Sequence, residues 1–257
     1  MAEILTFINQ KGGVGKTSLA MNFGIRLKMA GARVLLVDMD PQCNLTYIMG
    51  VDDPVYTVYE VMLCQVGVAD AVIHAAECDL LAASSNLSTL NLTLSGPGKE
   101  FYLRDALRPV ADSYDFIIID SPPTLGILTI NVLSVANSVI IPALADVFSL
   151  QGVGQLYASI QAVQVASNPA LKIDGIVLSR HTDRLLLSRE LREMMENAAQ
   201  QIHTRLFDAV IRESVVVREA QATRQSVFKY APRSKQTADY DKLVLEYLHS
   251  TGYMKDE

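Results

Sequence analysis

The segment KGGVGKTS, residues 11–18, restricts the fold of this 257-residue chain more than any other part of it. It follows an apolar, strand-like run at Ile4–Asn9 and leads into a helical pattern at Lys16–Met29. Its glycines permit backbone dihedrals that other residues avoid, and they leave room for a ligand to approach the main chain. A glycine-rich turn between a strand and a helix predicts a phosphate-binding loop, because backbone N–H groups and the positive end of the helix dipole converge there.

Strand-like apolar runs alternate with helical patterns along most of the chain. Runs such as VLLVD and FIIID are almost continuously Val, Ile and Leu, which is typical of strands covered by helices on both faces. The alternation predicts an α/β fold with a doubly wound, mostly parallel β-sheet flanked by helices, in a single P-loop domain spanning residues 1–257. The expected strands are Ile4–Asn9, Arg33–Asp38, Cys78–Ala82, Asp115–Asp120, Ser138–Pro142 and Lys172–Ser179. The expected helices are Lys16–Met29, Thr57–Leu63, Leu125–Ala136, Leu150–Ala166, Ser188–Ala199 and Asp239–Ser250.

The composition argues against several classes of protein. Half of the residues are hydrophobic and 19% are charged, so a sizeable core is available and wholesale disorder is not expected. A secretory leader and a membrane span are not expected either, because no apolar run approaches the ~18–20 residues that a span requires. Cys43, Cys64 and Cys78 match neither a redox pair nor a zinc site. They are expected to be reduced thiols of a cytoplasmic protein.

Acidic residues at two strand ends complete the predicted phosphate site. Asp38 and Asp40 alternate at the end of VLLVDMD, so they share a face of a regular strand. Asp120 ends FIIID, the position at which P-loop enzymes hold magnesium. We therefore expect ATP and Mg²⁺ as cofactors, with Lys16 near the β- and γ-phosphates and Thr17 supplying an oxygen to the metal. The expected nucleotide contacts are Lys11, Gly12, Gly13, Val14, Gly15, Lys16, Thr17 and Ser18, and the expected metal residues are Thr17, Asp38 and Asp120.

The residues before the loop depart from the usual pattern. Gln10 stands where the strict pattern has glycine, and Lys11 follows it. The resulting K-G-G-x-G-K-[ST] motif resembles the deviant Walker motif of the ParA/MinD family of ATPases. The resemblance extends over roughly residues 3 to 245 and is most specific over 9–18, 34–44 and 115–126. It implies an ATP-dependent homodimer in which Lys11 reaches the phosphates held by the partner subunit.

The same resemblance implies how the chain would hydrolyse ATP. Lys11, Lys16 and Asp40 are the expected catalytic residues, and Asp40 positions the attacking water. Asp38 is expected to be an outer-sphere or structural ligand of Mg²⁺. The loop Ser121–Thr124 resembles the family's switch loop, which senses whether a γ-phosphate is present.

Three features favour the ParA branch of the family. Ser138–Leu156 resembles the corresponding ParA-type segment. MinD-type relatives carry a basic amphipathic membrane helix, whereas the pattern at Asp239–Ser250 predicts a core-packing helix with an acidic polar face. The three cysteines do not match the ligands of an iron–sulfur cluster. The resemblance thus implies a partition ATPase that is cytoplasmic, nucleoid-associated when ATP-bound, and stimulated by a ParB-type partner. Two alternatives stay open: an ATPase that positions a protein cargo, and a nucleotide-gated interaction module with little turnover.

Charge is spread unevenly along the chain. The net charge is −6, yet residues 176–242 contain 12 Lys and Arg against 9 Asp and Glu, whereas residues 1–175 contain 9 against 16. Such asymmetry indicates either a surface for a polyanion or a solvated face. The ParA resemblance implies non-specific DNA binding by this basic region. The candidate contacts are Arg189, Arg192, Arg205, Arg212, Arg218, Arg224, Lys229, Arg233 and Lys235.

One segment of the basic region departs from the family. In SVVVREAQ, Ser214–Gln221, Val216 stands where relatives often have arginine, and Arg218 lies two residues further on. Arg218 would face the same side as Val216 only if the segment were extended rather than helical.

Overall fold

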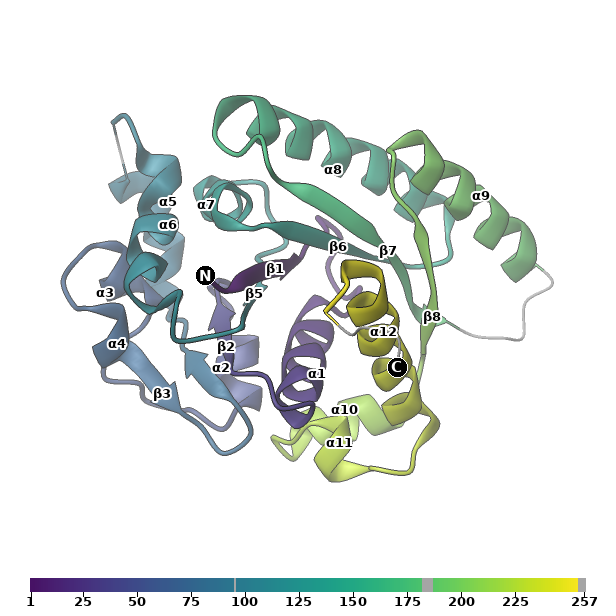
Figure 1. The fold of residues 1–257 in the computed structure, drawn as a ribbon, viewed down its shortest axis with the longest axis horizontal. Coiled ribbons are helices and arrows are strands. Elements are labelled where there is room, and N and C mark those ends of the chain that lie inside the picture. Colours follow the sequence, from purple (N-terminus) through teal and green to yellow (C-terminus); the bar gives the residue numbers. More distant parts are fainter. Residues whose placement is uncertain (95, 182–186, 254–257) are drawn as a thin grey trace.

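The computed structural model describes residues 1–94, 96–181 and 187–253. Its described strands form one eight-stranded sheet in the order β3-β4-β2-β5-β1-β6-β7-β8 (Figure 1). All neighbouring strands are parallel except β3 and β4, which are antiparallel. The strands are β1 (Glu3–Phe7), β2 (Val34–Asp38), β3 (Val72–His74), β4 (Asp79–Leu81), β5 (Phe116–Asp120), β6 (Ser138–Ala143), β7 (Lys172–His181) and β8 (Leu206–Arg212). The expected doubly wound, mostly parallel sheet is thus confirmed.

Helices cover both faces of the sheet. The α-helices are α1 (Lys16–Met29), α2 (Asn44–Ile48), α3 (Val58–Met62), α4 (Val68–Ala71), α5 (Leu90–Thr93), α6 (Tyr102–Leu107), α7 (Ile127–Val135), α8 (Val147–Ala166), α9 (Leu187–Gln201), α10 (Val215–Ala222), α11 (Val227–Tyr230) and α12 (Lys235–Thr251). Among the described residues, three short 3₁₀ helices lie at η1 (Ser85–Thr89), η2 (Lys99–Phe101) and η3 (Arg108–Val110).

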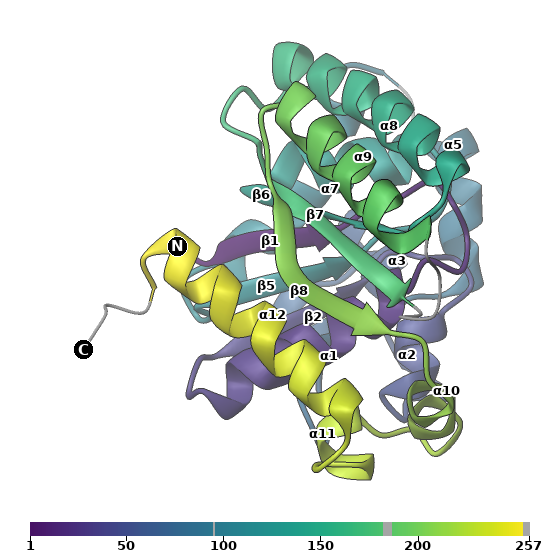
Figure 2. The same cartoon turned by 90° about the vertical axis from the view of Figure 1, so that its right-hand side faces the viewer.

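The pleat of the central strands explains the continuous apolar runs. Leu5 and Phe7 of β1 belong to the core cluster on one face of the sheet. Ile4, which directly precedes Leu5 in the same strand, belongs to the cluster on the opposite face. The first cluster packs under α1 and α12. On the other face, α3 to α7 cover one half of the sheet and α8 and α9 cover the other (Figures 1 and 2). Every residue of β2 and β5 is consequently buried.

All six expected strands and all six expected helices are present. Helix α1 has the expected bounds, and the ends of most other elements are shifted. Helix α8 begins at Val147, three residues before the prediction, because Asp146 caps it: its Oδ1 accepts a hydrogen bond of 2.7 Å from the Ser149 N–H. Helix α12 buries the expected stripe, which consists of Tyr240, Leu243, Val244, Tyr247 and Leu248. It is a core-packing helix, as predicted.

The short antiparallel edge strand β3 and the strand β8 were not predicted. Strand β8 buries Phe207, Ala209 and Ile211 and exposes Asp208 between them. A strand at the edge of the sheet alternates in this way, so it lacks the continuous apolar run that marks the central strands. Within the described residues, no helix is both long enough and apolar enough to span a lipid bilayer.

Candidate nucleotide-binding site

The carboxyl ends of three central strands meet at one edge of the sheet. Asp38 and Asp120, the last residues of β2 and β5, are register partners on neighbouring strands. Phe7, the last residue of β1, pairs with Asp120 on its other side. The glycine-rich loop leaves β1 here, and a cavity of about 480 Å³ opens beside it. In open α/β sheets, ligands bind outside the carboxyl ends of the strands.

The loop main chain is shaped to face a ligand. Gly13 and Gly15 have φ angles of +73° and +86°, which residues with a side chain rarely adopt. A Cβ atom added to Gly12 or Gly15 would meet no atom within 4 Å, so the space outside the loop is free. Helix α1 begins at Lys16 without a side-chain cap, which leaves its first N–H groups available to an anion.

Opposite charges are buried at the floor of the cavity. Lys16 is only 7% exposed, and burial lowers its pKa while the charges of Asp120 and Asp40 oppose that shift. Asp120 is fully buried, and neither of its carboxylate oxygens has a hydrogen-bond partner of ordinary geometry among the described residues. Burial raises the pKa of Asp120 well above its usual range, and the charge of Asp38 adds to this effect. A buried carboxylate without a partner is suited to a cation.

The residues at this edge fit magnesium bound together with a nucleotide. Among the described residues, no group of three or more His, Cys, Asp or Glu side chains could form a metal site alone. Magnesium usually takes one or two protein ligands and completes its shell with phosphate oxygens and waters. Asp120 and the neighbouring Thr17 hydroxyl, which also acts on the Asp120 pKa, meet that requirement.

Asp38 and Asp40 differ in what surrounds them. Asp38 Oδ2 accepts hydrogen bonds from the backbone N–H and the hydroxyl of Thr46, at 2.8 and 2.7 Å. Its Oδ1 accepts one from the Asp40 N–H at 3.1 Å, and burial raises its pKa to about 6. These contacts give Asp38 a structural role in the turn after β2. Asp40 borders the cavity, and its Oδ1 accepts one hydrogen bond of 3.0 Å from the Gln42 N–H.

Lys11 is engaged within its own chain. Its Nζ lies 2.8 Å from Asp146 Oδ2, and the two side chains are 38% and 33% exposed. Burial alone would raise the pKa of Asp146, but hydrogen bonds from Lys11 and from Ser149 outweigh it and lower that pKa. Asn9 supports the arrangement, because its Oδ1 accepts a hydrogen bond of 2.9 Å from the Lys11 N–H. In this structure the Lys11 side chain therefore points to the start of α8.

The predicted switch loop is anchored at both ends. The Ser121 hydroxyl donates to the Phe7 carbonyl at 2.7 Å, and the Thr124 carbonyl accepts a hydrogen bond from the Thr129 hydroxyl at 2.5 Å. Pro123, between these anchors, lines the cavity. The loop thus lies where it could contact a bound nucleotide.

Sequence reasoning missed several residues around the cavity, because they come from distant segments. The Ser179 hydroxyl of β7 donates to the Val14 carbonyl at 2.7 Å. The Gln221 amide of α10 donates to the Ser18 hydroxyl at 2.7 Å, and Tyr240 of α12 also lines the cavity. Arg180 donates to the Gly13 carbonyl at 2.9 Å. No spacing in the sequence marks these contacts.

Comparison with known proteins places the chain in a family. The sequence model of a family described as "AAA domain" matches residues 2–173. The Myxococcus xanthus chromosome partitioning protein ParA is 35% identical over 96% of this chain and 88% of its own length. The chain belongs to the ParA/MinD family of P-loop ATPases. The Bacillus subtilis sporulation initiation inhibitor protein Soj is 34% identical to this ParA/MinD member, over 96% of this chain and 98% of Soj.

A solved structure supports the same ParA/MinD fold. The Mycobacterium smegmatis cobyrinic acid a,c-diamide synthase with bound ADP and magnesium is 31% identical, with a TM-score of 0.86 over 99% of this chain and 98% of the other. That structure is similar in fold to the chain described above, and its ligands are those that the present cavity fits.

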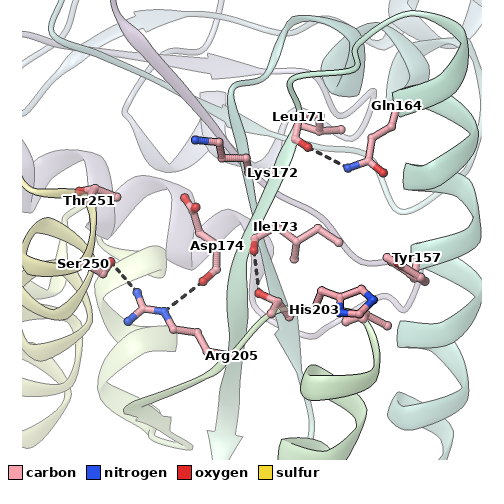
Figure 3. Close-up of a pocket in the computed structure, with 12 residues that line it drawn as sticks. Tyr157, Gln164, Leu171, Lys172, Ile173, Asp174, His203, Arg205, Ser250 and Thr251 are labelled. Carbon is pink, nitrogen blue, oxygen red and sulfur yellow. Dashed lines mark hydrogen bonds between the residues drawn. The ribbon is translucent and has the colours of Figure 1, made fainter.

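In this ParA/MinD protein the basic candidates do not form one surface. Arg192 pairs with Glu196 at 2.9 Å and Asp208 at 3.4 Å. Arg205 donates to the Asp174 carbonyl and the Ser250 hydroxyl at the amino edge of the sheet, in a cavity of about 710 Å³ on the side opposite the nucleotide loop (Figure 3). The side chain of Arg189, at the start of α9, lies outside the described residues.

The other candidates lie between the end of β8 and the start of α12. Arg224 is held by Asp52 in two hydrogen bonds of 2.8 and 2.6 Å, and Arg212 is paired with Asp239. The remaining candidates are exposed, and their side chains make no hydrogen bond or ion pair with any described residue; they are Arg218, Lys229, Arg233 and Lys235. These four side chains, which we call the α10–α12 basic group, are available to a ligand.

The segment Ser214–Gln221 is helical rather than extended. Ser214 caps α10, because its side chain accepts a hydrogen bond from the Val216 N–H. Successive helical residues are rotated by about 100°, so Val216 and Arg218 face different directions. Arg218 therefore does not replace an arginine at position 216. It lines the rim of the nucleotide cavity instead.

Proposed function

We propose that the chain is a ParA-type partition ATPase. It binds ATP with Mg²⁺, closes into a homodimer, holds DNA without sequence preference, and releases the DNA when a ParB-type partner stimulates hydrolysis. In the cell it would be cytoplasmic, and nucleoid-associated when ATP is bound. Membership of a family that includes ParA and Soj supports this proposal.

The loop and its acidic neighbours would hold the nucleotide. The N–H groups of residues 12–18 would surround the phosphates, with Lys16 neutralising the β- and γ-phosphates. Thr17 and Asp120 would hold Mg²⁺, which supplies charge neutralisation at the phosphates when it is bound. Asp40, at the cavity wall, would orient the attacking water.

Lys11 would link nucleotide binding to dimerisation. A cation donated to the partner's phosphates makes the dimer depend on bound triphosphate, and such a group can contribute roughly 10³–10⁵ in rate in phosphoryl transfer. Because Lys11 is paired with Asp146 in the single chain, forming the dimer requires this ion pair to break.

The observation that carries the DNA-binding proposal is the position of α10. Gln221 of α10 donates to Ser18 in the first turn of the nucleotide-binding helix, and Arg218 on the same helix is exposed without a partner among the described residues. A change in the position of Ser18 would therefore be passed through Gln221 to α10, which carries Arg218 of the α10–α12 basic group. Contacts from these side chains to DNA phosphates would release counterions and weaken steeply with salt.

A DNA co-sedimentation assay tests the proposal. The protein is mixed with DNA in four states: no nucleotide, ADP, ATP and a non-hydrolysable ATP analogue. We expect retention only with ATP and the analogue, and a fall in retention between ~50 and ~200 mM salt. Retention in all four states, or in none, would contradict the proposal. Recruitment to anionic liposomes with ATP but not to DNA would favour an ATPase that positions a protein cargo.

Matched variants locate the DNA surface. Lys229→Ala with Arg233→Ala should abolish most of the ATP-dependent retention and leave ATP binding unchanged, because both side chains are exposed and neither lines the nucleotide cavity. Arg104→Ala is the control, because Arg104 is also exposed but lies on α6, where it pairs with Asp105. If both variants behaved alike, DNA would bind elsewhere.

A further inference from the structure

The strand β7 ends in an unusual conformation beside the nucleotide cavity. Arg180 has a φ of +51°, in the left-handed region that residues with a side chain rarely adopt. Backbone outliers of this kind persist only where the surroundings hold them, and they concentrate at functional sites. Arg180 borders the cavity, and its side chain is 52% exposed.

The Arg180 guanidinium joins three segments of the chain. Its Nη1 donates to the Gly13 carbonyl at 2.9 Å. Its Nε and Nη2 donate to the two carboxylate oxygens of Glu213 at 2.5 and 3.4 Å. Glu213 directly follows β8, and its N–H donates to the His181 carbonyl at 3.0 Å. The arginine is therefore held in place on one side while it holds the glycine-rich loop on the other.

This contact sets the direction of a loop amide. The Gly13 carbonyl and the Val14 N–H belong to one planar trans peptide, so they point in opposite directions. Holding the carbonyl toward Arg180 fixes the N–H toward the opposite side of the loop. Ser179 does the same for the next peptide, because its hydroxyl donates to the Val14 carbonyl at 2.7 Å. Two successive residues of β7 thus fix two successive peptides of the loop.

We infer that Arg180, anchored by Glu213, is a positioning residue that orders the phosphate-binding loop for the α- and β-phosphates. Backbone N–H groups of such loops surround those phosphates, whereas the loop lysine reaches the β- and γ-phosphates. The inference rests on the proposed ATP site. It adds that a residue 167 positions away from Gly13 prepares the loop before the nucleotide arrives.

Nucleotide affinity and kinetics of Arg180→Met test the inference. We expect the dissociation constants of ADP and ATP to rise by the same factor, about tenfold, as is typical for loss of a charged hydrogen bond. KM should rise in parallel, while kcat at saturating ATP should stay within about twofold. Arg180→Lys should recover only part of the affinity, because lysine cannot donate to the loop and to both carboxylate oxygens at once.

Two further variants keep the test clear of folding effects. Arg180→Gly removes the side chain but suits the left-handed backbone, so the protein should fold normally and still bind nucleotide as weakly as Arg180→Met. Arg33→Met is the control. Arg33 also pairs with a carboxylate, that of Asp115, but this pair lies at the amino ends of the strands β2 and β5, away from the nucleotide loop.

Each contrary result has a distinct meaning. Loss of ATP affinity without loss of ADP affinity would overturn the inference in favour of a direct γ-phosphate contact. Unchanged affinity for both nucleotides in Arg180→Gly would overturn it outright. Wild-type protein that bound neither nucleotide would instead reject the proposed function.

Discussion

Lys11 Nζ lies 2.8 Å from Asp146 Oδ2, so the lysine expected to act on a partner subunit is held by its own chain in the single molecule. Asp146 also caps α8 through Ser149. The contact therefore connects the glycine-rich loop to the start of a 20-residue helix. Closing a dimer through Lys11 must exchange this ion pair for contacts with the partner's phosphates.

Asp146→Asn should make the ATP-dependent dimer form more readily. Asparagine caps helices about as well as aspartate, so α8 should be unaffected. The lost ion pair is partly exposed, and such pairs contribute about 0.2–1 kcal/mol each. A dimer breaks two of them, so we expect a dimer dissociation constant lower by at most about thirtyfold. Light scattering or analytical ultracentrifugation with a non-hydrolysable ATP analogue measures this.

Lys11→Ala provides the opposite case. It should retain nucleotide binding in the monomer and lose the dimer. If Asp146→Asn weakened the dimer as much as Lys11→Ala does, Asp146 would be part of the dimer contact rather than a competitor for Lys11.

Asp120→Asn should stabilise the nucleotide-free protein and abolish magnesium-dependent ATP binding. The substitution keeps the shape of a fully buried side chain. It removes a charge that makes no hydrogen bond of ordinary geometry with the described residues and lies beside Asp38, although Lys16 partly compensates it. We expect the free energy of unfolding to rise by about 1–2 kcal/mol without ligand. Added Mg²⁺ and ATP should raise the melting temperature of the wild type but not that of Asp120→Asn. Asp53→Asn, an exposed control, should behave as the wild type in both respects. A destabilised Asp120→Asn protein would show that the attraction between Asp120 and the buried Lys16 outweighs the desolvation and the repulsion from Asp38.

The pH dependence of stability should report on Asp174 at the amino edge of the sheet (Figure 3). Burial raises the pKa of Asp174 and of Glu3, and the charge of Asp174 further raises the pKa of Glu3. The folded state thus binds more protons than the unfolded chain once the pH exceeds about 4, and ionisation lowers the free energy of unfolding as the pH rises.

Asp174→Asn should therefore gain stability relative to the wild type as the pH increases. The difference in unfolding free energy should be smallest near pH 4 and grow toward pH 7, as measured by urea denaturation at several pH values. A difference that stayed constant over this range would mean that Asp174 ionises normally.

Local sequence was sufficient for the loop, the central strands and the acids at their ends. Glycine dihedrals, continuous apolar runs and the position of Asp120 are all properties of short segments. Local sequence was insufficient where a residue's contact partner lies far away along the chain. Neither Asp146, 135 positions from Lys11, nor Arg180, 167 from Gly13, is marked by any spacing. The basic residues show the same limit, because Arg205 and Arg224 are charged in the sequence but their charges are already paired in the fold.

Cys43 adopts a backbone conformation that suits glycine better than a residue with a side chain. Its φ is +57°, a left-handed conformation in which a Cβ atom is unfavourable. Burial, together with the charges of Asp38 and Asp40, raises the pKa of its thiol to about 11, so the thiolate is scarce at neutral pH.

Cys43→Gly should consequently stabilise the protein by about 1 kcal/mol, because glycine adopts this backbone without strain. Cys43→Ala is the matched control: it also removes the thiol but keeps the Cβ atom, so it should give no gain. Chemical denaturation of the three proteins measures the differences. Equal stabilisation by glycine and alanine would place the penalty in the thiol, and no stabilisation by either would show that the turn tolerates a side chain at position 43 without cost.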